Sequence, residues 1–191
     1  MEFEAGHIYH VFNRGNNRNR IFFHRENYFF FLRKIKKLVL PYTSILAWCL
    51  MPTCFHLMIY VHRKKLPDRS KDLNHSIGQM LSSYTRAVQN QMKIEGSLFQ
   101  QRIKAICLSQ NVKIASAFYG KEFGMVFDSC LEDSSFPHIC FDCIHNHPVQ
   151  NGLVEILEDW EFSSYRDYYF ERGGRLVDFK LADRELGIVR V

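Results

Sequence analysis

Residues 43–61 read TSILAWCLMPTCFHLMIYV, two apolar runs joined by the short polar-containing stretch Met51-Pro52-Thr53. Apolar runs of this length, rich in β-branched and aromatic side chains, are typical of strands. A proline-containing break between two such runs indicates a turn. We therefore expect strands over 43–50 and 54–62, connected by a tight turn.

The segments on either side of this pair show alternating strand and helix patterns. Before it, residues 7–12 read as a strand, and residues 25–40 repeat apolar side chains at helical spacing as far as Pro41. After it, residues 73–93 read as a long helix and residues 103–108 as a short strand. The order β-α-β-β-α-β predicts an α+β fold, an antiparallel-rich sheet with helices on one face.

The last third of the chain is less regular. Residues 111–137 show no clear pattern and are expected to form an insertion or long loop. Residues 138–147 read as a helix whose extent Pro148 should limit. The C-terminal extension 171–191 carries apolar side chains that can dock on the body. A length of 191 residues predicts a single domain.

Composition and charge narrow the class of protein. Hydrophobic residues make up 47% and charged residues 24%, which excludes a disordered or fibrous chain. The net charge of +5 and the pI of about 8.9 permit a polyanionic partner without requiring one. No apolar run approaches the ~18 residues of a membrane span. Because residues 1–5 do not resemble a secretory leader, we expect a cytoplasmic protein whose six cysteines are buried thiols or metal ligands.

Several short motifs, taken in chain order, resemble the REP-associated branch of the single-tyrosine HUH transposases. They include YHVFNRGN at 9–16, AWCLMP at 47–52, FHLM at 55–58 and DWEFSSY at 159–165. The resemblance extends over roughly residues 6–170 and implies an antiparallel sheet with helices packed on it, a relative of the ferredoxin-like layout. It also implies DNA transposition chemistry, in which a hairpin is recognised and a tyrosine hydroxyl cleaves the adjacent single strand, leaving a 5′-phosphotyrosine link.

The family holds a divalent ion, usually Mg²⁺ or Mn²⁺, between two histidines on one strand (the HUH motif) and a polar side chain one helical turn after the tyrosine. Strand residues two apart face the same side, and helix residues four apart share one face, so these groups converge on one ion beside the scissile phosphate. The sequence resembles a degenerate form of this site. Cys54 stands in place of the first histidine, Cys143 in place of the tyrosine and His147 in place of the third ligand; His56 is retained. We therefore expect tyrosine-dependent cleavage to be lost, which leaves open whether the protein is an enzyme.

The substituted residues have a metal chemistry of their own. In the family fold Cys54, His56, Cys143 and His147 would surround one ion, and a Cys₂His₂ set is typical of tetrahedral zinc. One hypothesis is that a catalytic magnesium site has become a closed structural zinc site.

Two alternatives to zinc remain open. In the first, the site drifted once cleavage was no longer selected, so that Mg²⁺ or Mn²⁺ binds weakly or not at all; Pro148 favours this alternative because it biases His147 away from helical geometry. In the second, catalysis survives in a rebuilt site, where Tyr84 is the nearest candidate to replace the missing nucleophile. We expect Tyr84 to pack in the core instead.

Basic residues give the expected DNA contacts. The loop after the first strand offers forked donors for phosphates and base edges. A second basic run follows the strand that carries Cys54 and His56, so we expect it beside the DNA strand that would be cut. Exposed rings such as Phe22, Phe23 or Tyr165 could stack on unpaired bases. The expected DNA-binding residues are Arg14, Asn16, Arg18, Arg20, Arg63, Lys64 and Lys65.

The leading interpretation is a DNA-binding protein of transposase lineage that recognises hairpin or single-stranded DNA and no longer cleaves it. One alternative is an active HUH-type transposase or nuclease with a rebuilt site. The other is a zinc-stabilised, domesticated scaffold that does not bind DNA. The resemblance leaves both a monomer and a homodimer open.

Overall fold

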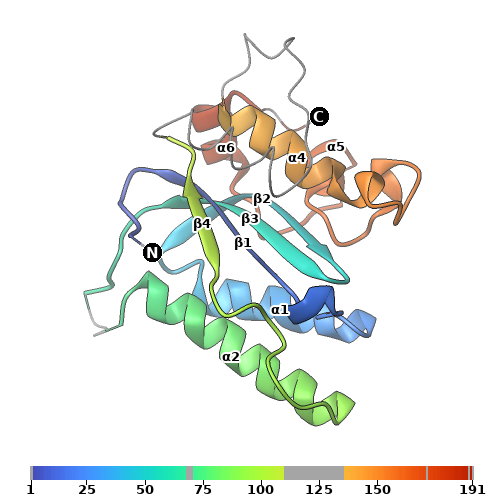
Figure 1. Ribbon diagram of the computed structural model, residues 1–191. Helices are drawn as coiled ribbons and strands as arrows, with labels where there is room; N and C mark the ends of the chain where they lie inside the picture. The colour runs from blue at the N-terminus through green and yellow to red at the C-terminus, as the bar shows by residue number, and fades with distance from the viewer. Residues whose placement is uncertain (1, 68–70, 110–135, 171, 189, 191) are drawn as a thin grey trace.

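The computed structural model describes residues 2–67, 71–109, 136–170, 172–188 and 190. In the described part of the chain, six strands and helices follow the order that the sequence pattern predicts, and three further helices come after them (Figure 1). The elements are β1 (Ile8–Arg14), α1 (Arg25–Leu38), β2 (Thr43–Met51), β3 (Cys54–Val61), α2 (Leu73–Met92), β4 (Lys104–Cys107), α4 (Phe136–Gln150), α5 (Tyr165–Tyr169) and α6 (Phe179–Leu186). The described connections also contain short 3₁₀ turns, η1 (Asn16–Arg18) and η3 (Leu157–Asp159).

Four strands of the described residues form one sheet in the order β2-β3-β1-β4, and every neighbouring pair in it is antiparallel. β2 and β3 pair as a hairpin, from Thr43 opposite Val61 to Met51 opposite Cys54. The register shifts between Ile45 and Ala47, which is the signature of a β-bulge. The antiparallel α+β fold expected from the sequence is confirmed.

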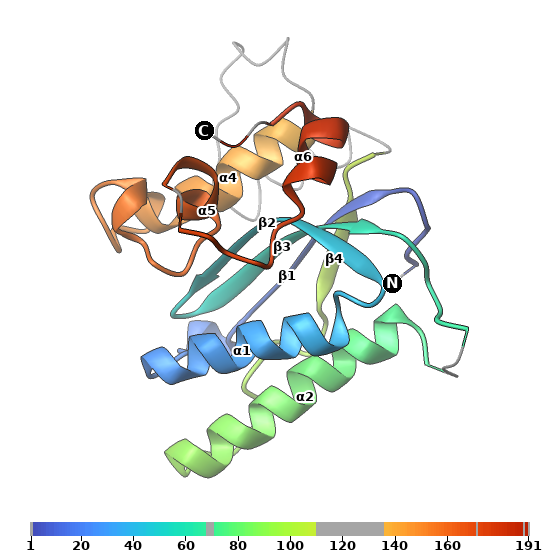
Figure 2. The ribbon, with the colours of Figure 1, turned by 180° about the vertical axis from the view of Figure 1, so that it is seen from behind.

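Helices cover both faces of this sheet, so the expectation of helices on one face is wrong. α1 and α2 lie together on one face, and α4 and α6 lie on the other (Figures 1 and 2). The order β-α-β-β-α-β accounts for α1 and α2 only. α4 comes from the irregular last third of the chain, and the burial of Phe141 and Ile144 supplies the hydrophobic free energy that holds it against β2 and β3.

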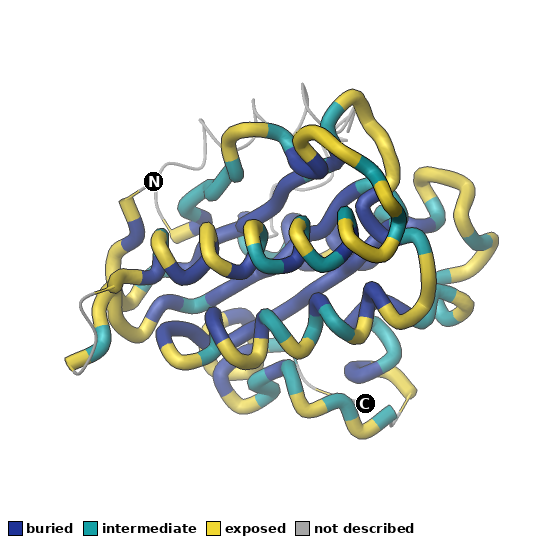
Figure 3. Tube along the Cα trace, turned by 90° about the horizontal axis from the view of Figure 1, so that it is seen from below, coloured by how far each residue is buried: buried dark blue, intermediate teal, exposed yellow. Residues whose placement is uncertain are grey.

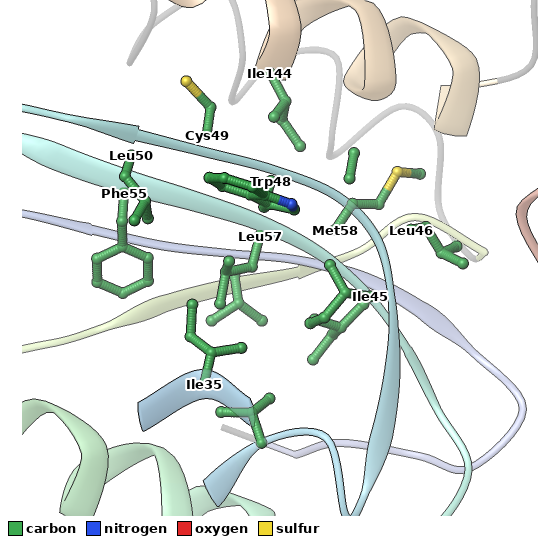
Figure 4. Packing of buried hydrophobic residues seen from close by; sticks show 14 of the residues in the cluster. Ile35, Ile45, Leu46, Trp48, Cys49, Leu50, Phe55, Leu57, Met58 and Ile144 are labelled. Atoms are coloured by element: carbon green, nitrogen blue, oxygen red, sulfur yellow. The ribbon is translucent and has the colours of Figure 1, made fainter. Parts of the chain in front are cut away.

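The core lies on both sides of the strands. Figure 4 shows Ile35 of α1 on one side of the sheet and Ile144 of α4 on the other, with strand side chains such as Leu57 between the layers. All nine residues of β2 are buried, whereas α1 and α2 turn exposed residues outward along their length (Figure 3). This two-sided burial explains the continuous apolar runs in 43–61, since strands covered on both faces do not alternate.

The outer edge of β2 is covered by the chain that follows η3. The backbone N–H of Leu50 donates to the carbonyl of Phe162, and that of Ser164 donates to the carbonyl of Trp48, both at 2.8 Å. Covering an edge strand in this way satisfies its unpaired backbone groups. The tail also docks, as expected, because Leu181 of α6 is buried. The insertion expected at 111–137 falls outside the described residues except for 136–137, which begin α4.

Pro148 does not end α4, contrary to expectation. The helix continues to Gln150, and the N–H of Asn151 donates to the carbonyl of His147 at 3.1 Å. A proline lacks the N–H that would bond to the carbonyl of Ile144, and its ring crowds that carbonyl. In the last turn of a helix, however, few further bonds depend on this position. His147 therefore keeps its place on the helix. Among the described helices, none combines the length and apolar character that crossing a bilayer requires.

Candidate metal and nucleic-acid site

A pocket of about 480 Å³ opens at one end of the sheet, where the β2–β3 turn, the end of β1, the start of β4 and the last turn of α4 meet. Its wall combines metal-binding side chains with basic and amide side chains. The residues that carry chemistry there are Cys54, His56, His147, Arg14, Arg18 and Lys104.

Three of the pocket residues form a group that could hold a metal ion. Cys54 and His56 share a face of β3, and His147 reaches the same point from α4. Their ligand atoms all lie within 4.8 Å of one another. Bond lengths of 2.0–2.3 Å in a tetrahedral zinc site place the donor atoms roughly 3.5 Å apart, so the three atoms would have to move closer together to bind one zinc ion.

The protonation states of this group suit metal binding. Burial lowers the pKa of His147 to about 4, and burial together with repulsion from His147 and His10 lowers the pKa of His56 well below its usual range. Both imidazoles are therefore neutral at neutral pH, which is the form that coordinates metals. Burial raises the pKa of Cys54 to about 12, so a metal ion must displace its proton.

The donor atoms decide which metal fits. A thiolate with two imidazoles matches zinc and other borderline transition metals, whereas Mg²⁺ prefers oxygen ligands. The Mg²⁺ that the resemblance implies therefore does not fit the residues present, and zinc does. A bound zinc ion would supply positive charge at the floor of the pocket.

Cys143 stands apart from this group. It lies one turn before His147 on α4 and is half-buried, but it is not a member of the three-residue group and does not line the pocket. Burial, with the neighbouring Asp142 carboxylate adding to it, raises the pKa of Cys143 to about 12. The structure thus brings together three of the four residues expected to bind zinc.

A tight turn brings Arg18 to the pocket. Asn17 and Arg18 have φ values of 52° and 60°, a left-handed conformation that non-glycine residues adopt at a cost of about 1 kcal/mol or more each. Gly15 makes the turn possible, because a Cβ atom at this position would lie 1.9 Å from the carbonyl oxygen of Asn19. Backbone strain of this kind is often found at functional sites.

The other expected DNA-binding residues lie elsewhere. Arg20 lines a separate hollow beside Phe23, and Asn16 is not part of the pocket wall. Residues 63–65 follow the opposite end of β3 from Cys54, and a strand of eight residues spans roughly 26 Å. This basic run therefore lies far from Cys54 along the strand, and its expected place beside the DNA strand stays a prediction.

Several pocket residues were not anticipated from the sequence. Lys104 enters the wall because β4 pairs with β1 and sets it opposite Phe12, where its ammonium lies 5.8 Å from the ring centroid. Gln100, Gln150 and Asn151 come from a loop and a helix end whose positions only the packing defines. No local sequence signal marks these residues.

The aromatic residues that the sequence suggested for catalysis or base stacking differ in their burial. Tyr84 is fully buried and its hydroxyl donates to the carbonyl of Ile21 at 2.7 Å, so it packs in the core as expected. Phe22 is also buried, at 1% exposure, and cannot stack on a base. Phe23 and Tyr165 are half-buried.

Comparison with known proteins finds relatives of this chain among solved structures. No known protein-family model matches this sequence, and no curated protein sequence matches it. A solved structure of a REP-associated tyrosine transposase bound to a REP hairpin aligns with 94% of this chain and 92% of its own, with a TM-score of 0.57 and 18% sequence identity. The two proteins share a fold. This chain therefore has a transposase-like α+β fold with a group of residues that could hold a metal ion at one end of its sheet.

Proposed function

We propose that this protein binds a DNA hairpin, or the single strand beside it, at the pocket and does not cleave it through a covalent intermediate. One observation carries the proposal. Arg14, Arg18 and Lys104 line the same pocket as the three-residue group that could hold a metal ion. Guanidinium and ammonium groups are the side chains that bind phosphates. The structural relative is described as bound to a REP hairpin, which supports DNA as the partner.

The loss of cleavage rests on Cys143, at the position where the family's tyrosine is expected. Burial raises the pKa of this thiol to about 12, so it stays protonated at neutral pH. The thiolate is the nucleophilic form, and Cys143 does not line the pocket. Tyr84 is turned into the core. Neither residue supports the alternative of an active enzyme with a rebuilt site.

We propose zinc as the metal, bound by Cys54, His56 and His147. The fourth position belongs to Cys143 in the closed structural form expected from the sequence, or to an oxygen of water or DNA phosphate in an open form. A zinc ion in either form would tie α4 to β3, because the ligands come from both elements. Such a cross-link between α4 and β3 is what the alternative of a zinc-stabilised scaffold requires, and that alternative is therefore a second candidate function.

Measurements of DNA binding and cleavage distinguish the DNA-binding protein from the scaffold and from the active enzyme. Fluorescence anisotropy with a labelled hairpin carrying a single-stranded 5′ flank should show binding that weakens linearly in log affinity with log salt concentration. A scrambled oligonucleotide without a hairpin is the control for nonspecific attraction. No binding at low salt would favour the scaffold. A covalent protein–DNA adduct on a denaturing gel after incubation with Mn²⁺ would favour the active enzyme.

A further inference from the structure

The imidazole of His10 contacts that of His56, which is one of the three residues that could hold a metal ion. His10 lies on β1, and its Nε2 is 3.1 Å from Nδ1 of His56 on β3. The two residues sit diagonally across the strand pair, since Phe12 is the register partner of His56. His10 is 1% exposed and His56 is 2% exposed, so this hydrogen bond is made away from bulk water.

The position of His10 is fixed by its neighbours. Phe12 stacks on the His10 ring with centroids 4.7 Å apart and planes at 27°. On the backbone, His10 is paired with Met58 of β3 and Ile106 of β4. A ring held by two neighbouring strands and an aromatic stack has little freedom to turn away from His56.

The hydrogen bond can form in two ways, and only one of them suits a metal. If Nδ1–H of His56 donates to His10, the Nε2 of His56 keeps a lone pair that can coordinate an ion. If Nε2–H of His10 donates instead, the Nε2 of His56 carries the proton and cannot coordinate. The partner of the non-coordinating nitrogen therefore sets the tautomer of a metal-binding histidine.

We propose that His10 is a positioning residue that accepts the Nδ1–H of His56 and so holds the Nε2 of His56 ready to bind a metal ion in the pocket. A neutral imidazole has one acceptor nitrogen, and Nε2 of His10 faces Nδ1 of His56 at hydrogen-bond distance. This inference rests on the metal site proposed above.

The test uses two variants of His10. In His10→Phe an aromatic ring can still stack on Phe12, but the acceptor is lost; in His10→Gln an amide oxygen can replace it. Zinc affinity, measured by competition with a chromogenic chelator, should fall about tenfold to a hundredfold in His10→Phe and recover in His10→Gln. His75→Phe makes the same change at an exposed histidine of α2 and should not alter zinc affinity.

A second measurement needs no metal. The ¹⁵N chemical shifts of the His56 ring in the zinc-free protein should show the proton on Nδ1, and in His10→Phe they should show a mixture of tautomers. A proton on Nε2 of His56 in the unaltered protein overturns the proposal, as does unchanged zinc affinity in His10→Phe. If the unaltered protein binds no zinc, the proposed metal site fails, while the ¹⁵N shifts still decide the role of His10.

Discussion

The imidazole rings of His56 on β3 and His147 on α4 stack with their centroids 4.6 Å apart and their planes at 30°. These residues are far apart in sequence and meet because α4 packs on the second face of the sheet. The candidate metal site and the docking of α4 are therefore one structural feature, and a change in either should be detectable in the other.

Metal removal should loosen α4. A ligand that binds only the folded protein stabilises it by about 2.7 kcal/mol when its free concentration is about a hundred times its Kd. For a chain of this size that corresponds to a fall in Tm of roughly 5–10 °C when a chelator removes zinc. Differential scanning fluorimetry with and without chelator measures the shift. In Cys54→Ser, which removes the thiolate, the shift should shrink; an equal shift in both proteins would place the metal elsewhere.

Replacing Cys143 with serine distinguishes the closed from the open zinc site. If the thiolate of Cys143 binds the metal, Cys143→Ser should lower zinc affinity by at least about tenfold, because a strong ligand of zinc is lost. Since Cys143 is not a member of the three-residue group, we expect zinc affinity to change by less than about twofold. Isothermal titration with zinc measures it, with Cys49→Ser as a control at a buried thiol outside the group.

Removing both pocket arginines should weaken DNA binding. The double variant Arg14→Ala, Arg18→Ala removes two cations from the pocket wall and should reduce hairpin affinity about tenfold to a hundredfold at low salt. The slope of log affinity against log salt should also fall by about 1.4–1.8, since each lost phosphate contact removes about 0.7–0.9. Arg33→Ala on the exposed side of α1 is the matched control. Equal salt slopes in the double variant and the unaltered protein would show that the pocket arginines do not contact DNA phosphates.

A methyl group at Gly15 should disrupt the turn that carries Arg18. The added Cβ would overlap the carbonyl oxygen of Asn19, so Gly15→Ala should lower the free energy of unfolding by about 2 kcal/mol and also weaken hairpin binding. Gly78→Ala is the control, because a Cβ on this helical glycine meets nothing within 4 Å and should stabilise the fold by about 0.5–1 kcal/mol. Chemical denaturation and anisotropy measure the two effects. A Gly15→Ala protein of unchanged stability would show that the turn can relax.

The sequence by itself determined the six elements from β1 to β4 and the placing of Cys54 and His56 on one strand face. These are local properties, because hydrophobic periodicity and the alternation of side chains along a strand depend only on nearby residues. The motif resemblance also led to the fold that the solved transposase structure shares.

Only the tertiary structure decided which side chains meet at the pocket. His147 joins Cys54 and His56 because α4 passes through Pro148 unbroken, while Cys143 on the same helix does not join them. Lys104 and His10 come to the site through the pairing of β1 with β4 and β3, over long stretches of chain. Such meetings depend on burying apolar surface between distant segments, a free energy that no local pattern encodes.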